Sequence, residues 1–204
     1  MPLKIQSKTH PEILIYWGFD KFENEDLIKF AWEGDLWFHV DKHSSAHIYL
    51  RTLNQFTLDN LPKDLIEEAA QITKENSIEG CKLNNVCIIY TPAQNLLKDG
   101  SMDTGTVSFH QDKLVKRYHC AERDKEYVKW VEKNKIEDKS ANLQQEKLDH
   151  EVEERKRLRA IRKLAEKEER EEADRRKQIK KEKDISGLYK NTEANNKNQE
   201  LDFW

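Results

Sequence analysis

Imidazole, carboxylate and aromatic side chains that could do chemistry gather in one short stretch of the chain. The stretch contains Trp37, His39, Asp41, His43 and His47. Imidazole and carboxylate groups are good ligands for divalent transition metals, and His39, Asp41 and His43 would share one face if a single strand held all three. Residues 41–45 have a turn composition, however, and a turn would separate these side chains. A hydrogen-bonded polar surface is therefore favoured over a metal site, and no metal or other cofactor is predicted.

The same stretch could instead bind single-stranded nucleic acid. Trp37 and Tyr49 offer ring faces on which unpaired bases stack, each stack contributing about 1–3 kcal/mol. Side chains that could meet phosphates or donate hydrogen bonds follow nearby, namely Lys42, Arg51, His39 and His47. The alternative interpretation places Trp37 in the core of a sheet that is buried on both faces. The spacing alone leaves both interpretations open.

Two alternating segments must position these side chains. In residues 36–41, Leu36, Phe38 and Val40 fall on one face of a strand, and the polar and aromatic residues fall on the other. Residues 47–51 alternate in the same way, with Ile48 and Leu50 at the apolar positions. A hairpin of these two strands would bring their polar-aromatic rows side by side.

The surrounding sequence predicts an α+β fold, in which helices pack on a mixed sheet. Further strands are expected at residues 13–17, 86–90, 106–110 and 114–119. One helix is expected to begin with Asn24 as its N-cap and to stop at Gly34. A second helix is expected at residues 62–75, where Pro62 suits the first turn.

Beyond residue 120 the pattern becomes helical and highly charged. Tyr127, Trp130 and Val131 form a stripe that suits a helix docked on the core. Residues 143–184 contain no Gly or Pro, and they carry opposite charges four positions apart, each pair contributing about 0.2–0.5 kcal/mol. These pairs are Glu151–Arg155, Glu153–Arg157, Glu166–Arg170, Glu171–Arg175 and Glu172–Arg176.

The long helix has only a short coiled-coil seam. Leu158, Ile161 and Ala165 fit such a seam, but Glu168 and Glu172 occupy its next two positions. A single solvated helix is therefore favoured over a coiled-coil dimer. The expected organisation is a globular domain over residues 1–120, a docking helix over 121–138, the long charged helix over 143–184 and an Asn-rich disordered tail over 187–204.

Composition limits the function classes. The net charge of −3 gives no overall basic footprint, so contact with a polyanion must come from local basic clusters. The chain contains no Walker loop, dinucleotide fingerprint, nucleophile elbow or zinc-protease motif, and it is not predicted to be an enzyme. No apolar run approaches the ~20 residues that span a bilayer. Three cysteines without a C-x-x-C motif favour a cytoplasmic location, with nuclear or membrane-peripheral locations as alternatives.

Basic residues are concentrated in three clusters. The first contains Lys113, Lys116 and Arg117. The second runs through residues 155–163 and lies between acidic runs, and the third runs through residues 175–183 and is the least neutralised. Each could bind a polyanion with an affinity that falls as salt rises.

Longer runs resemble the NFACT RNA-binding domain family. The resemblance rests on residues 18–28, residues 34–40 and the Ser45-Ala46-His47 step. The family pattern has a Gly-Arg turn, an Asn-acidic step, an Asp-x-Trp-Phe-His run and a Gly-Ser-His step. The positions that match it are Gly18, Asn24, Asp35, Trp37, His39 and His47. Phe19 stands where the family usually has Arg, and Lys21 could supply the missing charge.

The resemblance implies a non-catalytic module whose partner is RNA, or DNA as a related polyanion. Larger members of the family are ribosome-associated, which adds a ribosome or protein partner for the long helix as an expectation. A second hypothesis makes the helix a scaffold that binds DNA or an anionic membrane surface. A third is a metal-dependent enzyme that uses His39, Asp41 and His43. The case for a homodimer is weak.

Overall fold

The computed structural model describes the backbone of residues 2–138 and 142–201, and side chains as far as Lys181 and at Lys183. The chain divides into two units, Met1–Leu148 and Asp149–Trp204. The first unit holds the sheet and three of the described helices, and the second continues the C-terminal helix. This α+β fold followed by a long charged helix confirms the predicted fold class.

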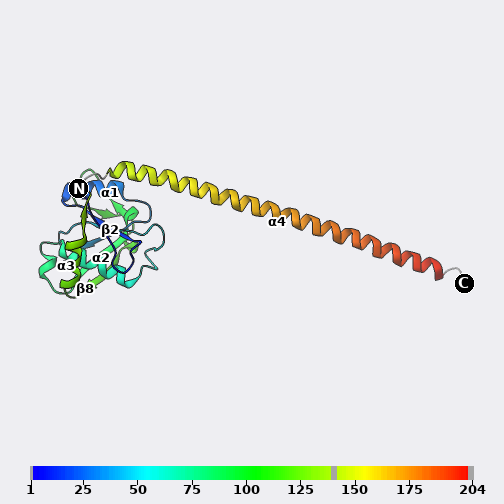
Figure 1. Ribbon diagram of the computed structural model, residues 1–204, viewed down its shortest axis with the longest axis horizontal. Coiled ribbons are helices and arrows are strands. Elements are labelled where there is room, and N and C mark those ends of the chain that lie inside the picture. The colour runs from blue at the N-terminus through cyan, green and yellow to red at the C-terminus, as the bar shows by residue number, and fades with distance from the viewer. Residues whose placement is uncertain (1, 139–141, 202–204) are drawn as a thin grey trace. The chain divides into compact units, whose positions relative to one another are not determined.

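One seven-stranded antiparallel sheet organises the first unit (Figure 1). Its spatial order is β8 (Lys116–Cys120), β5 (Val86–Pro92), β3 (Leu36–Val40), β4 (Ile48–Arg51), β2 (Leu14–Trp17), β1 (Leu3–Gln6) and β9 (Ile136–Glu137). A small second sheet pairs β6 (Leu96–Leu97) with β7 (Ser108–Phe109). The helices are α1 (Lys21–Phe30), α2 (Lys63–Glu75), α3 (Lys125–Asn134) and α4 (Leu143–Leu201).

The centre of the sheet is buried on both faces. On one face, Phe38 and Ile48 lie in the main core, with Leu65 of α2 and Val131 of α3. On the other face, Trp37, Tyr49, Tyr16 and Ile89 pack against Leu27 of α1 in a second cluster. The predicted hairpin is confirmed, because β3 and β4 pair with Trp37 opposite Tyr49. The open question about Trp37 is also answered: it is core in a two-sided sheet.

Several predicted boundaries are wrong. Helix α1 begins at Lys21, because the Asp20 side chain accepts hydrogen bonds from the first turn. Asn24 is therefore not the N-cap but a buried residue inside the helix. The helix ends at Phe30, before Gly34, which instead has a φ of 88° in the following turn. Strands β1 and β9 were not predicted, since each is short and lies outside the alternating runs.

The Asp35 carboxylate, 1% exposed, links three parts of the second face. Its Oδ2 accepts hydrogen bonds from the Tyr16 hydroxyl at 2.5 Å and from the Trp32 backbone N–H at 2.8 Å. Arg51 donates to the same carboxylate at 3.3 and 3.4 Å, and its guanidinium lies 3.6 Å from the centroid of the Trp32 ring. Burial disfavours the charged guanidinium, but Tyr16 and Asp35 outweigh that effect and raise the pKa of Arg51.

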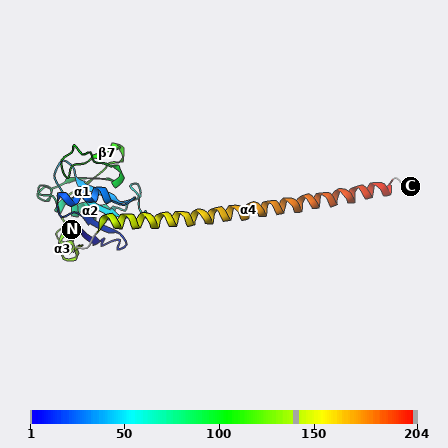
Figure 2. The same cartoon turned by 90° about the horizontal axis from the view of Figure 1, so that it is seen from above.

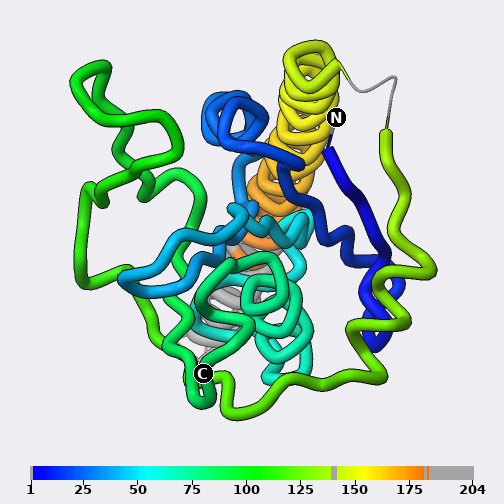
Figure 3. Tube along the Cα trace, turned by 90° about the vertical axis from the view of Figure 1, so that its left-hand side faces the viewer, coloured from blue at the N-terminus to red at the C-terminus, as the bar shows by residue number. Residues whose placement is uncertain are grey.

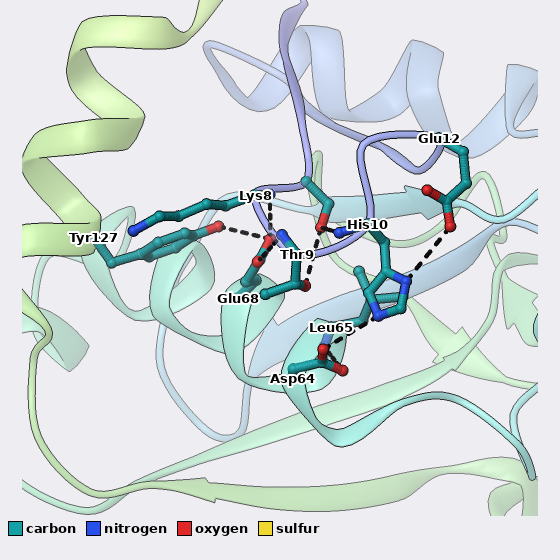
Figure 4. A network of polar contacts seen from close by, with 9 residues as sticks. Lys8, Thr9, His10, Glu12, Asp64, Leu65, Glu68 and Tyr127 are labelled. Atoms are coloured by element: carbon teal, nitrogen blue, oxygen red, sulfur yellow. Dashed lines mark hydrogen bonds and ion pairs between the residues drawn. The ribbon is translucent and has the colours of Figure 1, made fainter.

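A second buried carboxylate anchors the N-terminal loop to α2 (Figure 4). Glu68 accepts hydrogen bonds from the backbone N–H groups of Lys8 and Thr9, at 3.0 and 2.9 Å, and from the Tyr127 hydroxyl at 3.3 Å. At the edge of this network, the His10 imidazole lies 3.2 Å from the Asp64 carboxylate. Glu68 thereby connects the loop after β1 with α2 and α3 on the face opposite Asp35.

Helix α4 is continuous in Figures 1 and 2 and carries many charge pairs. Two predicted pairs are present, Glu151–Arg155 at 3.6 Å and Glu172–Arg176 at 2.6 Å. Three other acidic residues pair differently: Glu153 with Lys156, Glu166 with Arg162 and Glu171 with Lys167. The helical backbone extends to Leu201, into the segment 187–204 that was predicted to be disordered, and residues 202–204 lie outside the described residues.

Replacing Asp35 with Ala tests the buried network. The substitution leaves the Arg51 charge buried without its carboxylate, so the free energy of unfolding should fall by about 3–5 kcal/mol. Urea denaturation followed by circular dichroism measures the change. The control is Asp59→Ala, which removes an exposed carboxylate paired with Lys116 and should change stability by less than about 0.5 kcal/mol. Similar losses in the two variants would contradict a structural role for Asp35.

Candidate nucleic-acid interface

A groove of about 580 Å³ lies on the second face of the sheet, beside α1. Most of its lining comes from four places: Lys21 and Asn24 of α1, Trp37 and His39 of β3 with His47 just before β4, the turn at residues 42–45, and the loop at residues 104–107. Ile89 of β5 and Phe109 of β7 complete it. Figure 3 shows the chain around residues 98–107 in green. The groove therefore brings together residues that are distant in sequence, and six of the nine predicted nucleic-acid contacts line it.

Aromatic rings form the floor of the groove. The Trp37 and His39 rings stack with centroids 5.4 Å apart, and His47 meets Trp37 edge-on at 5.3 Å. His39 Nδ1 donates to the Val40 carbonyl at 2.7 Å, and His47 Nε2 donates to the Gly105 carbonyl at 3.1 Å. Since a carbonyl only accepts, the second nitrogen of each neutral ring carries a lone pair.

Both imidazoles are held in the neutral form. Burial lowers the pKa of His39, and it lowers that of His47 to about 3. At neutral pH these rings cannot attract phosphate by charge. His47 is 1% exposed, so only the partly buried His39 ring offers a surface for stacking or hydrogen bonding with a ligand.

Three buried polar atoms belong to side chains that line the groove. They are Asn24 Oδ1, Trp37 Nε1 and His47 Nδ1, and none of them has a hydrogen-bond partner among the residues that the structure describes. Buried polar atoms are paired in more than about 90% of cases, so each exception needs a specific explanation. Three such atoms around one groove are what a site for a polar ligand would contain.

The loop wall of the groove is attached to α1 by charge. The Gly105 N–H donates to the Glu25 carboxylate at 2.6 Å, and Lys98 Nζ lies 2.7 Å from that carboxylate. Lys98 also donates to the carbonyls of Asp103 and Thr106. Desolvation alone would raise the pKa of Glu25, but the Lys98 and Gly105 contacts outweigh it and lower this pKa. No local pattern in the sequence indicates this clamp of Glu25, Lys98 and Gly105.

Exposed cations lie at the rim of the groove. Lys21 and Lys42 are both exposed and line it. Lys42 sits in the turn with a φ of 66°, a left-handed conformation that non-glycine residues seldom adopt. Two exposed rings adjoin Lys21 along the chain, Phe19 at 74% and Phe22 at 64% exposure, and Lys21 Nζ lies 5.2 Å from the Phe22 ring centroid.

Three predicted contact residues have structural roles instead. Tyr49 is fully buried and stacks on Tyr16 with centroids 5.0 Å apart, so it offers no free ring face. Arg51 is committed to Asp35 and cannot reach a phosphate. Gly18 provides space, because a Cβ there would lie 2.5 Å from Asn24 Oδ1. Asp35, which matches the family pattern, likewise belongs to the buried network and not to the groove.

The three residues of the metal hypothesis, His39, Asp41 and His43, each contact a different partner and do not converge on one site. His39 donates to Val40, and Asp41 lies 3.9 Å from Arg117. The His43 imidazole lies 2.6 Å from the Glu79 carboxylate. Among the residues whose side chains the structure describes, no group of three or more metal-binding side chains is arranged to hold an ion. Within residues 2–138 and 142–201, no helix is long and apolar enough to cross a membrane.

His47→Gln tests whether His47 is neutral in the folded protein. The unfolded chain takes up a proton near the usual pKa of 6.5, whereas folded His47 does so at about 3. Stability is therefore lost as pH falls between these values, by about 1.4 kcal/mol per pH unit from this residue. Urea denaturation from pH 7 to pH 5 should show a shallower pH dependence for His47→Gln. The exposed His119→Gln serves as control, and equal slopes for wild type and His47→Gln would contradict the assignment.

Known proteins share both the sequence and the fold of this chain. A family model described as the NFACT protein RNA binding domain matches residues 4–111. Coiled-coil domain-containing protein 25 is 48% identical in Danio rerio, over 71% of this chain and 70% of the relative. The Mus musculus protein is 47% identical, over 69% and 67%. Protein JLP2 of Saccharomyces cerevisiae is 37% identical, over 60% and 61%.

A solved structure shows the same fold at low sequence identity. It is that of the C-terminal part of the fibronectin/fibrinogen-binding protein from Streptococcus suis, with a TM-score of 0.55 and 20% identity. The match covers 66% of this chain and 50% of that chain. Since the family model spans more than half of the 204 residues, the resemblance seen in the sequence is confirmed: this chain belongs to the NFACT RNA-binding domain family.

Proposed function

We propose that this chain is a non-catalytic RNA-binding protein that takes an unpaired RNA segment into the groove beside α1. The observation that carries the proposal is the groove itself, which combines exposed Lys21 and Lys42 with buried, unpartnered polar atoms. Lysines at a rim neutralise phosphates, and polar atoms at a floor suit the edges of bases. Membership of an RNA-binding family supports the same function.

We assign base stacking to an exposed ring and not to the buried rings that the sequence suggested. Trp37 and Tyr49 are at most 1% exposed, so neither can stack on a base without leaving the core. Phe22 is exposed and lies beside Lys21, a combination that binds a base and its phosphate together. Trp37 is also a poor experimental probe, because truncating a buried Trp costs about 3–5 kcal/mol of stability.

Helix α4 supplies a second set of charges that could bind a separate partner. As an extension of the RNA-binding proposal, we propose that α4 binds a ribosome or a protein partner. We also propose that the protein acts in the cytoplasm. The competing function is direct binding of DNA or an anionic membrane surface by the basic cluster at residues 175–183 of this helix. Lys180 and Lys181, both exposed on the helix, allow the groove and the helix to be tested in the full-length chain.

Lys21→Ala/Lys42→Ala should weaken binding of a single-stranded RNA about tenfold at low salt. Loss of two phosphate contacts should also reduce the slope of log affinity against log salt by about 1.4. Fluorescence anisotropy at several salt concentrations measures both quantities. Lys180→Ala/Lys181→Ala removes the same charge from α4 and should leave groove binding nearly unchanged. If the helix variant loses affinity and the groove variant does not, α4 is the RNA-binding element.

Phe22→Ala separates stacking from charge. Loss of one base–ring stack should lower RNA affinity by a factor of about 5 to 160, from the usual 1–3 kcal/mol per base. The salt dependence should not change, since no phosphate contact is removed. Ile78→Ala is the control, because it also truncates an exposed apolar side chain but removes no aromatic ring. Unchanged affinity in Phe22→Ala would exclude stacking at this ring.

A further inference from the structure

The pairing of strands β3, β5 and β8 extends the face that forms the groove floor across the sheet. His39 of β3 lies opposite Ile89 of β5, and Ile89 lies opposite Arg117 of β8. Directly paired residues project from the same face of a sheet. His39, Ile89 and Arg117 therefore form one row, whose first two members line the groove.

A second row runs parallel to the first. The Asp41 N–H donates to the Cys87 carbonyl at 2.9 Å, and Cys87 lies opposite His119. The residues of β8 that alternate with Arg117 and His119 face the other way: Tyr118 and Cys120 belong to the main core, under α2. Arg117 and His119 thus lie on the groove face.

This part of the face is open. The Arg117 side chain is 62% exposed, and His119 is exposed. β8 is the edge strand of the seven-stranded sheet. With strands about 4.8 Å apart, two steps from β3 to β8 cover about 10 Å, which is the length of about three stacked nucleotides at 3.4 Å each.

The charge on this face suits a phosphodiester backbone. Arg117 Nε lies 3.9 Å from Asp41 Oδ2, an ion pair that is too long to be a hydrogen bond. A guanidinium has five N–H donors, so most remain for a phosphate, which Arg can bind through two parallel hydrogen bonds. Lys42, next to Asp41 in the chain, is at the groove rim and links the two regions.

We propose that the row from His39 across Ile89 to Arg117 is a second RNA subsite, which binds the backbone of nucleotides that continue beyond the groove. This inference rests on the proposed function of the groove. Arg117 is its phosphate ligand, and His119 flanks the same path. The competing explanation is that a charged Arg117 only protects the edge strand from pairing with another chain.

The subsite predicts a dependence on RNA length. Two single-stranded RNAs of mixed sequence, about four and about twelve nucleotides long, are titrated by fluorescence anisotropy against the full-length protein. Arg117→Ala should weaken binding of the long RNA about tenfold and reduce its salt slope by about 0.7, the value for one phosphate contact on a single strand. The short RNA, which fits the groove alone, should bind as it does to wild type.

Two controls make the result decisive. Arg123→Ala removes an arginine that pairs with Glu75 of α2 and should leave binding of both RNAs unchanged. Arg117→Lys should restore part of the long-RNA affinity, because it returns a charge without the two-pronged geometry. Matching thermal midpoints show that the variants are folded.

Each outcome bears on a different claim. If Arg117→Ala leaves the long RNA unaffected, or weakens both RNAs equally, the second subsite is overturned. The groove still stands in that case if Lys21→Ala/Lys42→Ala weakens binding of both RNAs. If Lys21→Ala/Lys42→Ala has no effect on either RNA while Arg117→Ala weakens both, RNA binds outside the groove and the proposed function itself fails. If wild type binds neither RNA, both proposals fall.

Discussion

Asp35 lies one residue before β3, and its carboxylate is bonded to Tyr16 of β2 and Arg51 of β4. Because a strand alternates strictly, fixing Asp35 also fixes the direction of Trp37 and His39. The position of the groove floor thus depends on a charge pair that is almost entirely buried. A buried pair of this kind adds little stability compared with apolar packing, but breaking it is costly. The pair joins β2, β3 and β4 in one polar network on this face of the sheet.

The second face changes character along β3. Near Asp35 it is a packed aromatic core, in which Tyr16 and Tyr49 stack. Toward the other end it opens, and His39 is only partly buried. Rigid packing at one end therefore holds the imidazoles at the other, which suits a binding site that must be formed before its ligand arrives.

Alternation in the sequence was sufficient to predict the two strands of the hairpin and which side chains share a face. It could not show that the second face is also buried, because covering residues such as Leu27 and Phe109 belong to other segments. Arg51 illustrates the limit: a charged residue in a strand usually marks solvent, and only the distant Asp35 makes it a core residue. Asp20 and Asn24 are both residue types that cap helices well, so the sequence alone did not show that Asp20 is the N-cap of α1.

The long-range contacts of the groove were beyond any local pattern. Gly105 is 58 residues from His47 and 80 from Glu25, and both contacts are between a side chain and the backbone, which any residue provides. Family resemblance identified His39 and His47 as positions of interest. It also included Gly18 and Asp35, whose roles are spatial and structural, because a shared motif preserves the residues that build a site together with those that contact its ligand.

The left-handed backbone of Lys42 has a consequence for protein engineering. A side chain with a Cβ in this region costs about 1–2 kcal/mol, whereas glycine enters it freely. Thermostabilisation guided by backbone geometry alone would therefore replace Lys42 with Gly and gain stability from a more relaxed turn. The same change would remove an ammonium group from the groove rim, so the more stable variant would bind a polyanion more weakly.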